Sequence, residues 1–148
     1  MAAVSVIIPA FNRALKVARA ISSVLHQTFT DYEIIVVDDG STDGTRYAMR
    51  QFGDKISFMR HQSNLGVSAA RNTGIRGSDA PLIAFLDSDD YWLSEKLGPQ
   101  ISFFKSHPEA MISQTEEIWI RNGRYANPKT RHIKPSGDVL MCLVFGLA

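Results

Sequence analysis

The chain has 148 residues, of which 45% are hydrophobic and 21% charged, and these are ordinary values for a globular protein with one core. Its formal net charge is +1 and Lys and Arg form no dense run, so composition does not favour a nucleic-acid partner. A single cysteine, Cys142, excludes an internal disulfide and a cysteine-based metal site. Since no apolar run reaches the length of a membrane span and no signal peptide is evident, we expect a soluble, cytoplasmic protein.

Alternating apolar and amphipathic segments predict the fold class. Four short apolar runs rich in β-branched residues predict strands buried on both faces: residues 4–8, 33–37, 56–59 and 82–86. The segments between and after them predict helices: residues 15–27, 42–52, 66–76 and 94–107. Ser41, Thr42 and Ser94 are candidate helix caps. This order is typical of an α/β fold with a mostly parallel sheet and helices on both faces.

The pattern changes after Pro108. Residues 110–113 are predicted to form a strand, and 117–120 with 124–125 a β-hairpin, because Asn122-Gly123 favours a type I′ turn. A loop over 128–137 and a helix over 138–148, which contains Cys142, are predicted to follow.

Polar residues follow three of the predicted strands. They lie within the segments 9–12, 38–39 and 87–90. Ligands of an open parallel sheet bind beyond the carboxyl ends of its strands, near the point where strand order reverses. These segments are therefore the candidate binding site.

The segment after the fourth strand has three carboxylates among four residues. Asp87, Asp89 and Asp90 repel one another unless a cation or protons neutralise them. On an extended segment Asp87 and Asp89 point to the same side, where carboxylate oxygens suit Mg²⁺ or Mn²⁺. The alternative is an acidic cluster at the start of the following helix.

Four sequence segments together resemble the family 2 glycosyltransferases. They are Val4-Ser5-Val6-Ile7-Ile8-Pro9-Ala10-Phe11-Asn12, Val36-Val37-Asp38-Asp39-Gly40-Ser41-Thr42-Asp43, Asn64-Leu65-Gly66-Val67-Ser68-Ala69-Ala70-Arg71-Asn72 and Phe85-Leu86-Asp87-Ser88-Asp89-Asp90. Each segment is a weak indication by itself, but all four occur in the family's order and spacing across residues 4–92. The resemblance implies a GT-A fold, the Rossmann-like fold of one class of nucleotide-sugar transferases.

The resemblance also implies roles for individual residues. Pro9, Ala10 and Phe11 would form the wall around the base and ribose, and Asp39 would accept the N–H of a uracil-like base. Asp38 belongs to the same nucleotide-binding segment, where it would contact the nucleotide or only brace the loop.

Residues of the third and fourth segments would complete the site. Arg71 would reach the base or the diphosphate, Asp87 would contact the ribose, and Ser88 would lie in the nucleotide-sugar site. Asp89 would bind the divalent cation, Mn²⁺ or Mg²⁺, that bridges the two phosphates.

Simpler interpretations stand beside these roles. Pro9 would only end its strand, Asp38 and Asp39 would only cap the helix after Ser41, and Arg71 would be a solvated surface charge. Tyr91 and Trp92 are expected to be packing residues. Surface or structural roles are expected for the four histidines: His26, His61, His107 and His132.

The chain departs from the family pattern at several positions. Phe11 stands where relatives often have Tyr, and Arg13 stands where they often have Glu. The acceptor-side carboxylate that activates the acceptor hydroxyl is not evident, because Glu116 and Glu117 match no family motif. We therefore expect one domain in which 1–108 is the nucleotide-sugar-binding core and 109–148 begins a truncated acceptor-side part.

The predicted function is metal-assisted transfer of a sugar from a nucleoside diphosphate, with UDP-sugars favoured, to an acceptor hydroxyl with inversion. The acceptor would be a glycan or a lipid-linked molecule, which would permit peripheral membrane contact, and the chain alone should transfer little sugar. The alternative is a non-catalytic nucleotide-sugar-binding domain. A sugar nucleotidyltransferase is disfavoured because residues 9–13 contain no glycine for a triphosphate-binding loop. A dehydrogenase is disfavoured because no Gly-x-Gly-x-x-Gly motif follows a predicted strand.

Overall fold

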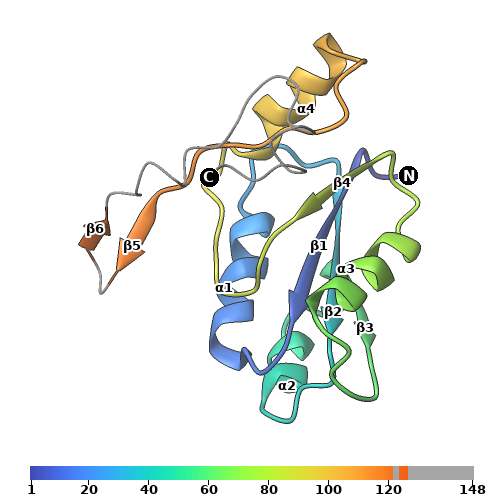
Figure 1. Ribbon diagram of the computed structural model, residues 1–148, viewed down its shortest axis with the longest axis vertical. Helices are drawn as coiled ribbons and strands as arrows, with labels where there is room; N and C mark the ends of the chain where they lie inside the picture. The colour runs from blue at the N-terminus through green and yellow to red at the C-terminus, as the bar shows by residue number, and fades with distance from the viewer. Residues whose placement is uncertain (122–123, 127–148) are drawn as a thin grey trace, which may run out of the picture. The chain divides into compact units, whose positions relative to one another are not determined.

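The computed structural model describes residues 1–121 and 124–126. The chain is divided into two compact units, Met1–Ile101 and Ser102–Ala148. Figure 1 shows that the first unit contains a parallel sheet with helices on both of its faces. Its strands are β1 (Val4–Ala10), β2 (Tyr32–Asp38), β3 (Ser57–Arg60) and β4 (Leu82–Phe85). The predicted fold class is confirmed.

The two central strands, β1 and β2, form the middle of the core. Every residue of β1 is buried, and so are the last five residues of β2. Alternate side chains of these strands enter two separate apolar clusters, one on each face of the sheet. This two-sided burial explains why the strands appear as continuous apolar runs in the sequence.

The helices divide between the two faces. α1 (Ala14–Leu25) and α2 (Thr45–Arg50) supply apolar residues to the larger cluster, and α3 (Val67–Arg76) packs on the opposite face. α3 approaches β1 closely at Gly74, where a Cβ atom would lie 2.5 Å from Cγ2 of Ile7.

The strand order places a switch point beside β1. The order is β3-β2-β1-β4, so the chain runs outward from β1 through β2 and β3 and then returns to the other side of β1. All pairings are parallel, and the carboxyl ends of β1, β2 and β4 therefore share one edge of the sheet. This edge carries the candidate binding segments.

Pro9 does not end β1, contrary to the simpler interpretation. The strand continues to Ala10, and Pro9 pairs in register with Val37. β4 pairs with β1 only as far as Ile7, so the missing N–H of Pro9 falls beyond the last paired residue on that side.

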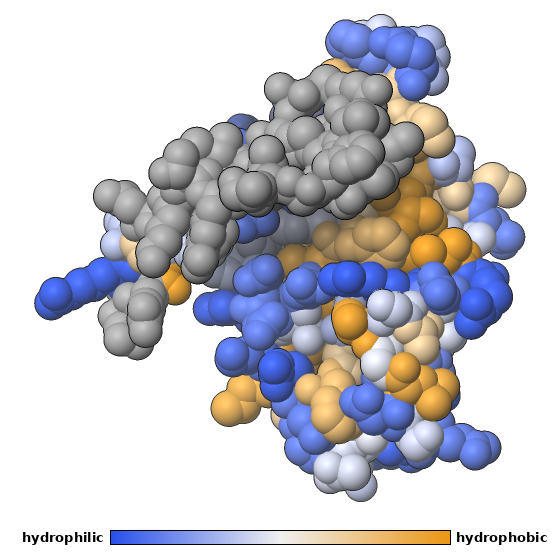
Figure 2. Space-filling view, in the orientation of Figure 1, coloured by the Kyte–Doolittle hydropathy of each residue, from blue (hydrophilic) through white to orange (hydrophobic). Residues whose placement is uncertain are grey.

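β4 is one of the two edge strands of the described sheet, and β3 is the other. Its side chains alternate in burial, with Ile83 36% and Phe85 44% exposed. Apolar surface is visible beside β4 in the space-filling view (Figure 2).

Two predicted helix starts were wrong. α2 begins at Thr45 after Gly44, and it is followed by a short 3₁₀ helix, η1 (Gly53–Lys55). α4 (Leu97–Ser106) begins three residues after the expected cap Ser94, whose carbonyl instead accepts the N–H of Thr28. In both cases tertiary hydrogen bonds hold the candidate caps outside the helix.

The second unit contains an antiparallel hairpin, as predicted. It consists of β5 (Trp119–Arg121) and β6 (Arg124–Ala126), and the conformation of the turn lies outside the described residues. The strand predicted at 110–113 was wrong, because this segment forms no ladder and Met111 is 93% exposed. The predicted segments 128–137 and 138–148, with Cys142, lie outside the described residues. Over the residues that the structure describes, no helix has the length and hydropathy needed to cross a membrane.

Candidate functional site

The end of β1 brings three predicted residues to the shared edge of the sheet. Pro9 and Ala10 are buried in the strand, while Phe11, just beyond it, is 40% exposed. Of this predicted wall, Phe11 therefore offers the largest accessible side chain to a ligand.

Asn12 joins the ends of β1 and β2. It has a φ of 51°, its N–H donates to Oγ of Ser41 at 2.9 Å, and its Oδ1 accepts the N–H of Thr42 at 2.9 Å. Asparagine tolerates this left-handed conformation better than most residues. Ser41 and Thr42 thus fix the loop after β1 rather than cap a helix.

Asp38, the last residue of β2, is fully buried. Its Oδ1 accepts the N–H of Ser41 at 3.0 Å, and its Oδ2 lies 3.1 Å from Nε of Arg60. The latter contact is an ion pair without the alignment of a hydrogen bond. Arg60 also donates from Nη2 to the carbonyl of Ser41 at 2.9 Å. Asp38 therefore braces the loop, which is one of the two roles weighed from the sequence.

Asp39 connects the end of β2 to the segment between β3 and α3. Its Oδ1 accepts the N–H of Leu65 at 2.9 Å, and its Oδ2 accepts the N–H of Gly66 at 2.8 Å. Nδ1 of His61 lies 2.7 Å from Oδ1, while Nε2 of His61 lies 2.9 Å from Oγ1 of Thr73. The residue is only 3% exposed, and it does not cap the helix that follows Ser41, because α2 begins at Thr45 without a side-chain cap.

Hydrogen bonding determines the charge state of Asp39. Burial would raise the pKa of its carboxyl group, but hydrogen bonds from Leu65, His61 and Gly66, with the charge of His61, lower the pKa below 3.8. Asp39 is therefore an ionised, anchored carboxylate.

The segment after β4 forms a turn rather than an extended strand. The N–H of Asp90 donates to the carbonyl of Asp87 at 3.0 Å, and Ser88 is buried, with 7% exposure. The expectation that Asp87 and Asp89 point to one side rested on an extended segment, so its basis was wrong. The alternative helix-start interpretation also fails, because α4 begins only at Leu97.

Asp87 pairs with Arg71, another predicted site residue. Nη2 of Arg71 donates to Oδ1 of Asp87 at 2.7 Å, and the guanidinium carbon lies 5.5 Å from the ring centre of Phe85. The side chains of Arg71 and Asp87 are 36% and 50% exposed. Arg71 is thus held at the strand end by α3 and is more than a solvated charge.

Asp89 faces the start of α1. Its Oδ2 lies 3.8 Å from Nε of Arg13 and 4.0 Å from Nζ of Lys16, and its side chain is 42% exposed. The backbone carbonyl of Asp89 accepts a hydrogen bond from Nη2 of Arg19 at 3.2 Å. Long ion pairs at this exposure are weak, so the carboxylate is available to a ligand.

The donor set is suited to a divalent cation only when a ligand completes the coordination. Among the described residues no group of three or more His, Cys, Asp and Glu side chains is arranged to hold a metal ion. Mg²⁺ and Mn²⁺ are commonly held by one or two carboxylates plus phosphate oxygens and water. The accessible carboxylate of Asp89 fits such a site if a diphosphate supplies the other ligands.

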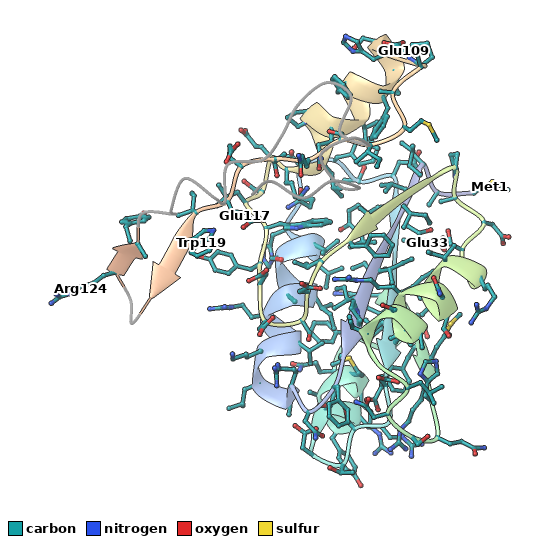
Figure 3. The ribbon with its side chains drawn as sticks, viewed as in Figure 1. Met1, Glu33, Glu109, Glu117, Trp119 and Arg124 are labelled. Carbon is teal, nitrogen blue, oxygen red and sulfur yellow. The ribbon has the colours of Figure 1, made fainter. Side chains whose placement is uncertain are left out.

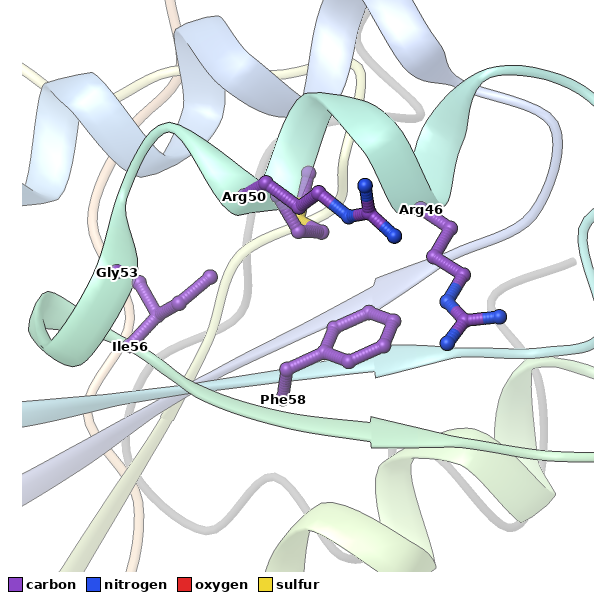
Figure 4. A pocket seen from close by; sticks show the side chains of 6 residues that line it. Arg46, Arg50, Gly53, Ile56 and Phe58 are labelled. Carbon is purple, nitrogen blue, oxygen red and sulfur yellow. The ribbon is translucent and has the colours of Figure 1, made fainter.

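Two further features involve none of the residues predicted for the nucleotide-sugar site. A depression of about 280 Å³ lies between α2, η1 and β3, and none of the predicted site residues lines it. Figure 4 shows the side chains that line this depression. In the second unit, Glu117 accepts a hydrogen bond from Nε1 of Trp119 at 3.1 Å (Figure 3). Glu116 is exposed just before it.

Sequence reasoning missed His61 as a member of the strand-end network. Asn12 was included in the candidate segment 9–12, but its hydrogen bonds to Ser41 and Thr42 were not predicted. His61 directly follows β3, so it occupies a strand-end position of the kind already used for the aspartates, and the rule that ligands bind at these ends could have found it.

Comparison with known proteins assigns the family. The model of the family described as "Glycosyl transferase family 2" matches residues 5–139. The chain belongs to glycosyltransferase family 2. A sugar nucleotidyltransferase or a dehydrogenase is thereby set aside.

Two curated members of this family illustrate the relationship. The Escherichia coli protein named UDP-Glc:alpha-D-GlcNAc-diphosphoundecaprenol beta-1,3-glucosyltransferase WfgD is 36% identical over 130 residues, which cover 85% of this chain and 51% of WfgD. The putative teichuronic acid biosynthesis glycosyltransferase TuaG of Bacillus subtilis is 39% identical over 68% of this chain and 41% of TuaG. The chain therefore spans about half or less of the length of these family members.

Solved structures of glycosyltransferases have the same fold. S. aureus TarS 1-349 in complex with UDP-GlcNAc superimposes with a TM-score of 0.68 and 29% identity, covering 73% of this chain and 32% of TarS. The mannosyltransferase PcManGT from Pyrobaculum calidifontis, in complex with GDP-Man and Mn²⁺, has a TM-score of 0.58 and 27% identity, covering 61% of this chain and 28% of that one.

Proposed function

We propose that this chain is the donor-binding part of a glycosyltransferase that transfers a sugar from a nucleoside diphosphate, most favourably UDP, to an acceptor hydroxyl with inversion. The observation that carries the proposal is the Arg71–Asp87 pair, which joins α3 to the end of β4 beside the switch point. TarS with UDP-GlcNAc and WfgD, whose name specifies UDP-Glc, support a UDP-sugar donor.

Different strand-end residues bind different parts of the donor. Phe11 packs on the base, Asp39 accepts its ring N–H, and Asp87 contacts the ribose. Arg71, which donates a hydrogen bond to Asp87, would bind the base or a phosphate oxygen. Pro9, Ala10, Asp38 and Ser88 are mostly buried, so their part is to shape and hold the site.

A divalent cation, Mn²⁺ or Mg²⁺, completes the proposed site at Asp89. When bound, the cation would act as a Lewis acid on the diphosphate and stabilise the departing nucleotide. Arg13 and Lys16 keep positive charge within 4.0 Å of Asp89 in the free protein. The Mn²⁺ in the PcManGT complex supports a cation in a protein of this fold.

The acceptor is proposed to be a glycan or a lipid-linked sugar. WfgD carries a diphosphoundecaprenol-linked sugar in its name, and an acceptor of that kind would bring the reaction to the cytoplasmic membrane surface. An acceptor hydroxyl would attack the sugar carbon from the side opposite the leaving diphosphate, in one displacement, after a general base takes its proton.

Calorimetry with three nucleotides tests the donor assignment. The protein is titrated with UDP, GDP and TDP in the presence of Mn²⁺, and UDP is expected to bind most tightly. Negligible heat with all three would refute donor binding, whereas preference for GDP would refute only the uracil assignment. Turnover of the matching sugar donor with varied acceptors then separates an enzyme from a non-catalytic binding domain.

A further inference from the structure

A line of hydrogen bonds runs from Asp39 through His61 to Thr73. It joins the end of β2, the residue after β3 and the middle of α3 through contacts of 2.7 and 2.9 Å. The His61 side chain is 12% exposed, and its backbone N–H donates to the carbonyl of Asp38 at 2.9 Å. Both ring nitrogens and the backbone of His61 are therefore engaged.

The direction of these hydrogen bonds follows from the charge of Asp39. An ionised carboxylate only accepts, so Nδ1 of His61 carries a hydrogen and donates it to Oδ1. A hydroxyl can donate or accept, and the Thr73 contact therefore permits both the neutral and the charged form of the ring. The ring orientation is fixed in either form.

His61 also determines which carboxylate oxygen of Asp39 keeps acceptor capacity. Oδ1 already accepts from His61 and from the N–H of Leu65, whereas Oδ2 accepts only from the N–H of Gly66. A carboxylate oxygen has about two lone-pair positions, so one position remains on Oδ2. Because 4% of the Asp39 side chain is exposed, its orientation determines whether a ligand N–H can reach that position.

We infer that His61 is a positioning residue for nucleotide recognition, which locks Asp39 so that Oδ2 accepts the ring N–H of the donor base. This inference rests on the proposed function, in which Asp39 meets the base. His61 does not touch the donor itself. Its effect is expected in base discrimination and not in diphosphate binding.

Two isosteric substitutions separate positioning from general structural support. The amide nitrogen of Asn lies as many bonds from Cα as Nδ1 of His, and that of Gln as many as Nε2. His61→Asn therefore keeps a donor for Asp39 and loses the Thr73 contact, while His61→Gln keeps a partner for Thr73 and loses the Asp39 contact. The two variants should lose similar stability, which thermal unfolding checks.

The experiment measures binding of UDP and of N3-methyl-UDP, which lacks the ring N–H, to each protein with Mn²⁺. Wild type should prefer UDP by about tenfold or more, since a site that pairs an N–H rejects an analogue without it. His61→Asn should keep most of this preference, and His61→Gln should reduce it to less than about threefold. An unchanged preference in His61→Gln, or equal losses in both variants, would overturn the inference. Failure of wild type to bind UDP at all would instead refute the proposed function.

A measurement on the wild-type protein guards against misfolded variants. Long-range ¹H–¹⁵N NMR should find Nδ1 of His61 protonated, and its signal should persist when UDP binds. Loss of that protonated Nδ1 signal on UDP binding would mean that the ligand releases His61 from Asp39, and the inference would be wrong.

Discussion

Two acidic segments at the same edge of the sheet have opposite environments. Asp38 and Asp39, after β2, are at most 3% exposed and are held by backbone N–H groups, an arginine and a histidine. Asp87 and Asp89, after β4, have side chains 50% and 42% exposed, and these side chains form ion pairs with Arg71 and with Arg13 and Lys16. The first pair is built into the protein, whereas the second can exchange its partners for a ligand.

This difference assigns distinct tasks to similar residues. A buried carboxylate with several donors fixes the geometry of its surroundings, and its removal leaves those donors unpaired. An exposed ion pair contributes little to stability, so replacing it with a bound cation or phosphate costs little. Substitution of the buried carboxylates should therefore lower the stability of the protein. Substitution of the exposed carboxylates should weaken ligand binding with little loss of stability.

The largest expected effect is that of Asp39→Ala on stability. The substitution leaves the N–H groups of Leu65 and Gly66 and the ring of His61 without their acceptor. Urea denaturation should give a loss of about 4 kcal/mol in the free energy of unfolding, since each unpaired buried group costs about 1–3 kcal/mol. The matched control, Asp89→Ala, should lose less than about 1 kcal/mol. Equal losses would contradict the distinction between the segments.

Gly40→Ala should have the next largest effect, because Gly40 allows the loop after β2 to touch the segment after β3. Its φ is +74°, and a Cβ atom would lie 2.5 Å from the backbone carbon of Ser63. We expect a loss of about 2–3 kcal/mol by thermal or urea unfolding. Gly53→Ala is the control, since its φ is also positive but nothing lies within 4 Å of the new methyl group, so it should lose about 1 kcal/mol. A Gly40→Ala loss no greater than the control's would show that the close approach is unimportant.

Low pH should reduce the stability that the ionised carboxylate of Asp39 provides. The pKa of Asp39 is lowered in the folded protein by its hydrogen bonds, against the effect of burial, so below about pH 3.8 the unfolded chain binds more protons. The stabilisation is complete above that pH and is lost as the pH falls through the lowered pKa. Urea midpoints at pH 5 and pH 3 measure this loss. Asp39→Asn should have a shallower dependence, and an identical dependence would exclude Asp39 as its source.

The smallest stability effect is expected for the Arg71–Asp87 pair. A double-mutant cycle with Arg71→Gln and Asp87→Asn should give a coupling free energy of about 0.2–1 kcal/mol, because both side chains are exposed to solvent screening. Each single variant should nevertheless weaken UDP binding. A coupling above about 2 kcal/mol would place this pair with the structural carboxylates.

Sequence patterns predicted the fold because strands that are buried on both faces of a sheet consist of continuous apolar residues. The apolar runs of β1 and β2 and the helices between them follow from this burial, and the hairpin was predicted from the residue pair Asn122-Gly123. Helix starts were predicted less well. Serine is a common helix cap, but Ser41 and Ser94 form hydrogen bonds with Asn12 and Thr28 instead and lie before the helices that they were expected to cap.

The candidate site was predicted by position but not by environment. Strand-end residues could be located from the sequence, yet Asp39 and Asp89 look alike there. The burial of Asp39 depends on His61, Leu65 and Gly66, which come from a distant segment, whereas the Asp89 side chain is 42% exposed. The extended geometry assumed for 87–90 failed because a local hydrogen bond between Asp87 and Asp90 closes a turn.

Metal-dependent nucleotide binding by the exposed segment can be tested most directly with UDP. UDP affinity is measured by calorimetry with Mn²⁺ and with EDTA, for wild type and for Asp89→Asn. We expect Mn²⁺ to strengthen binding to wild type, and Asp89→Asn to lose about 1–3 kcal/mol of binding free energy, the value of a hydrogen bond or contact to a charged group. Wild-type affinity that is the same with Mn²⁺ and with EDTA, and unchanged in Asp89→Asn, would contradict the proposed site.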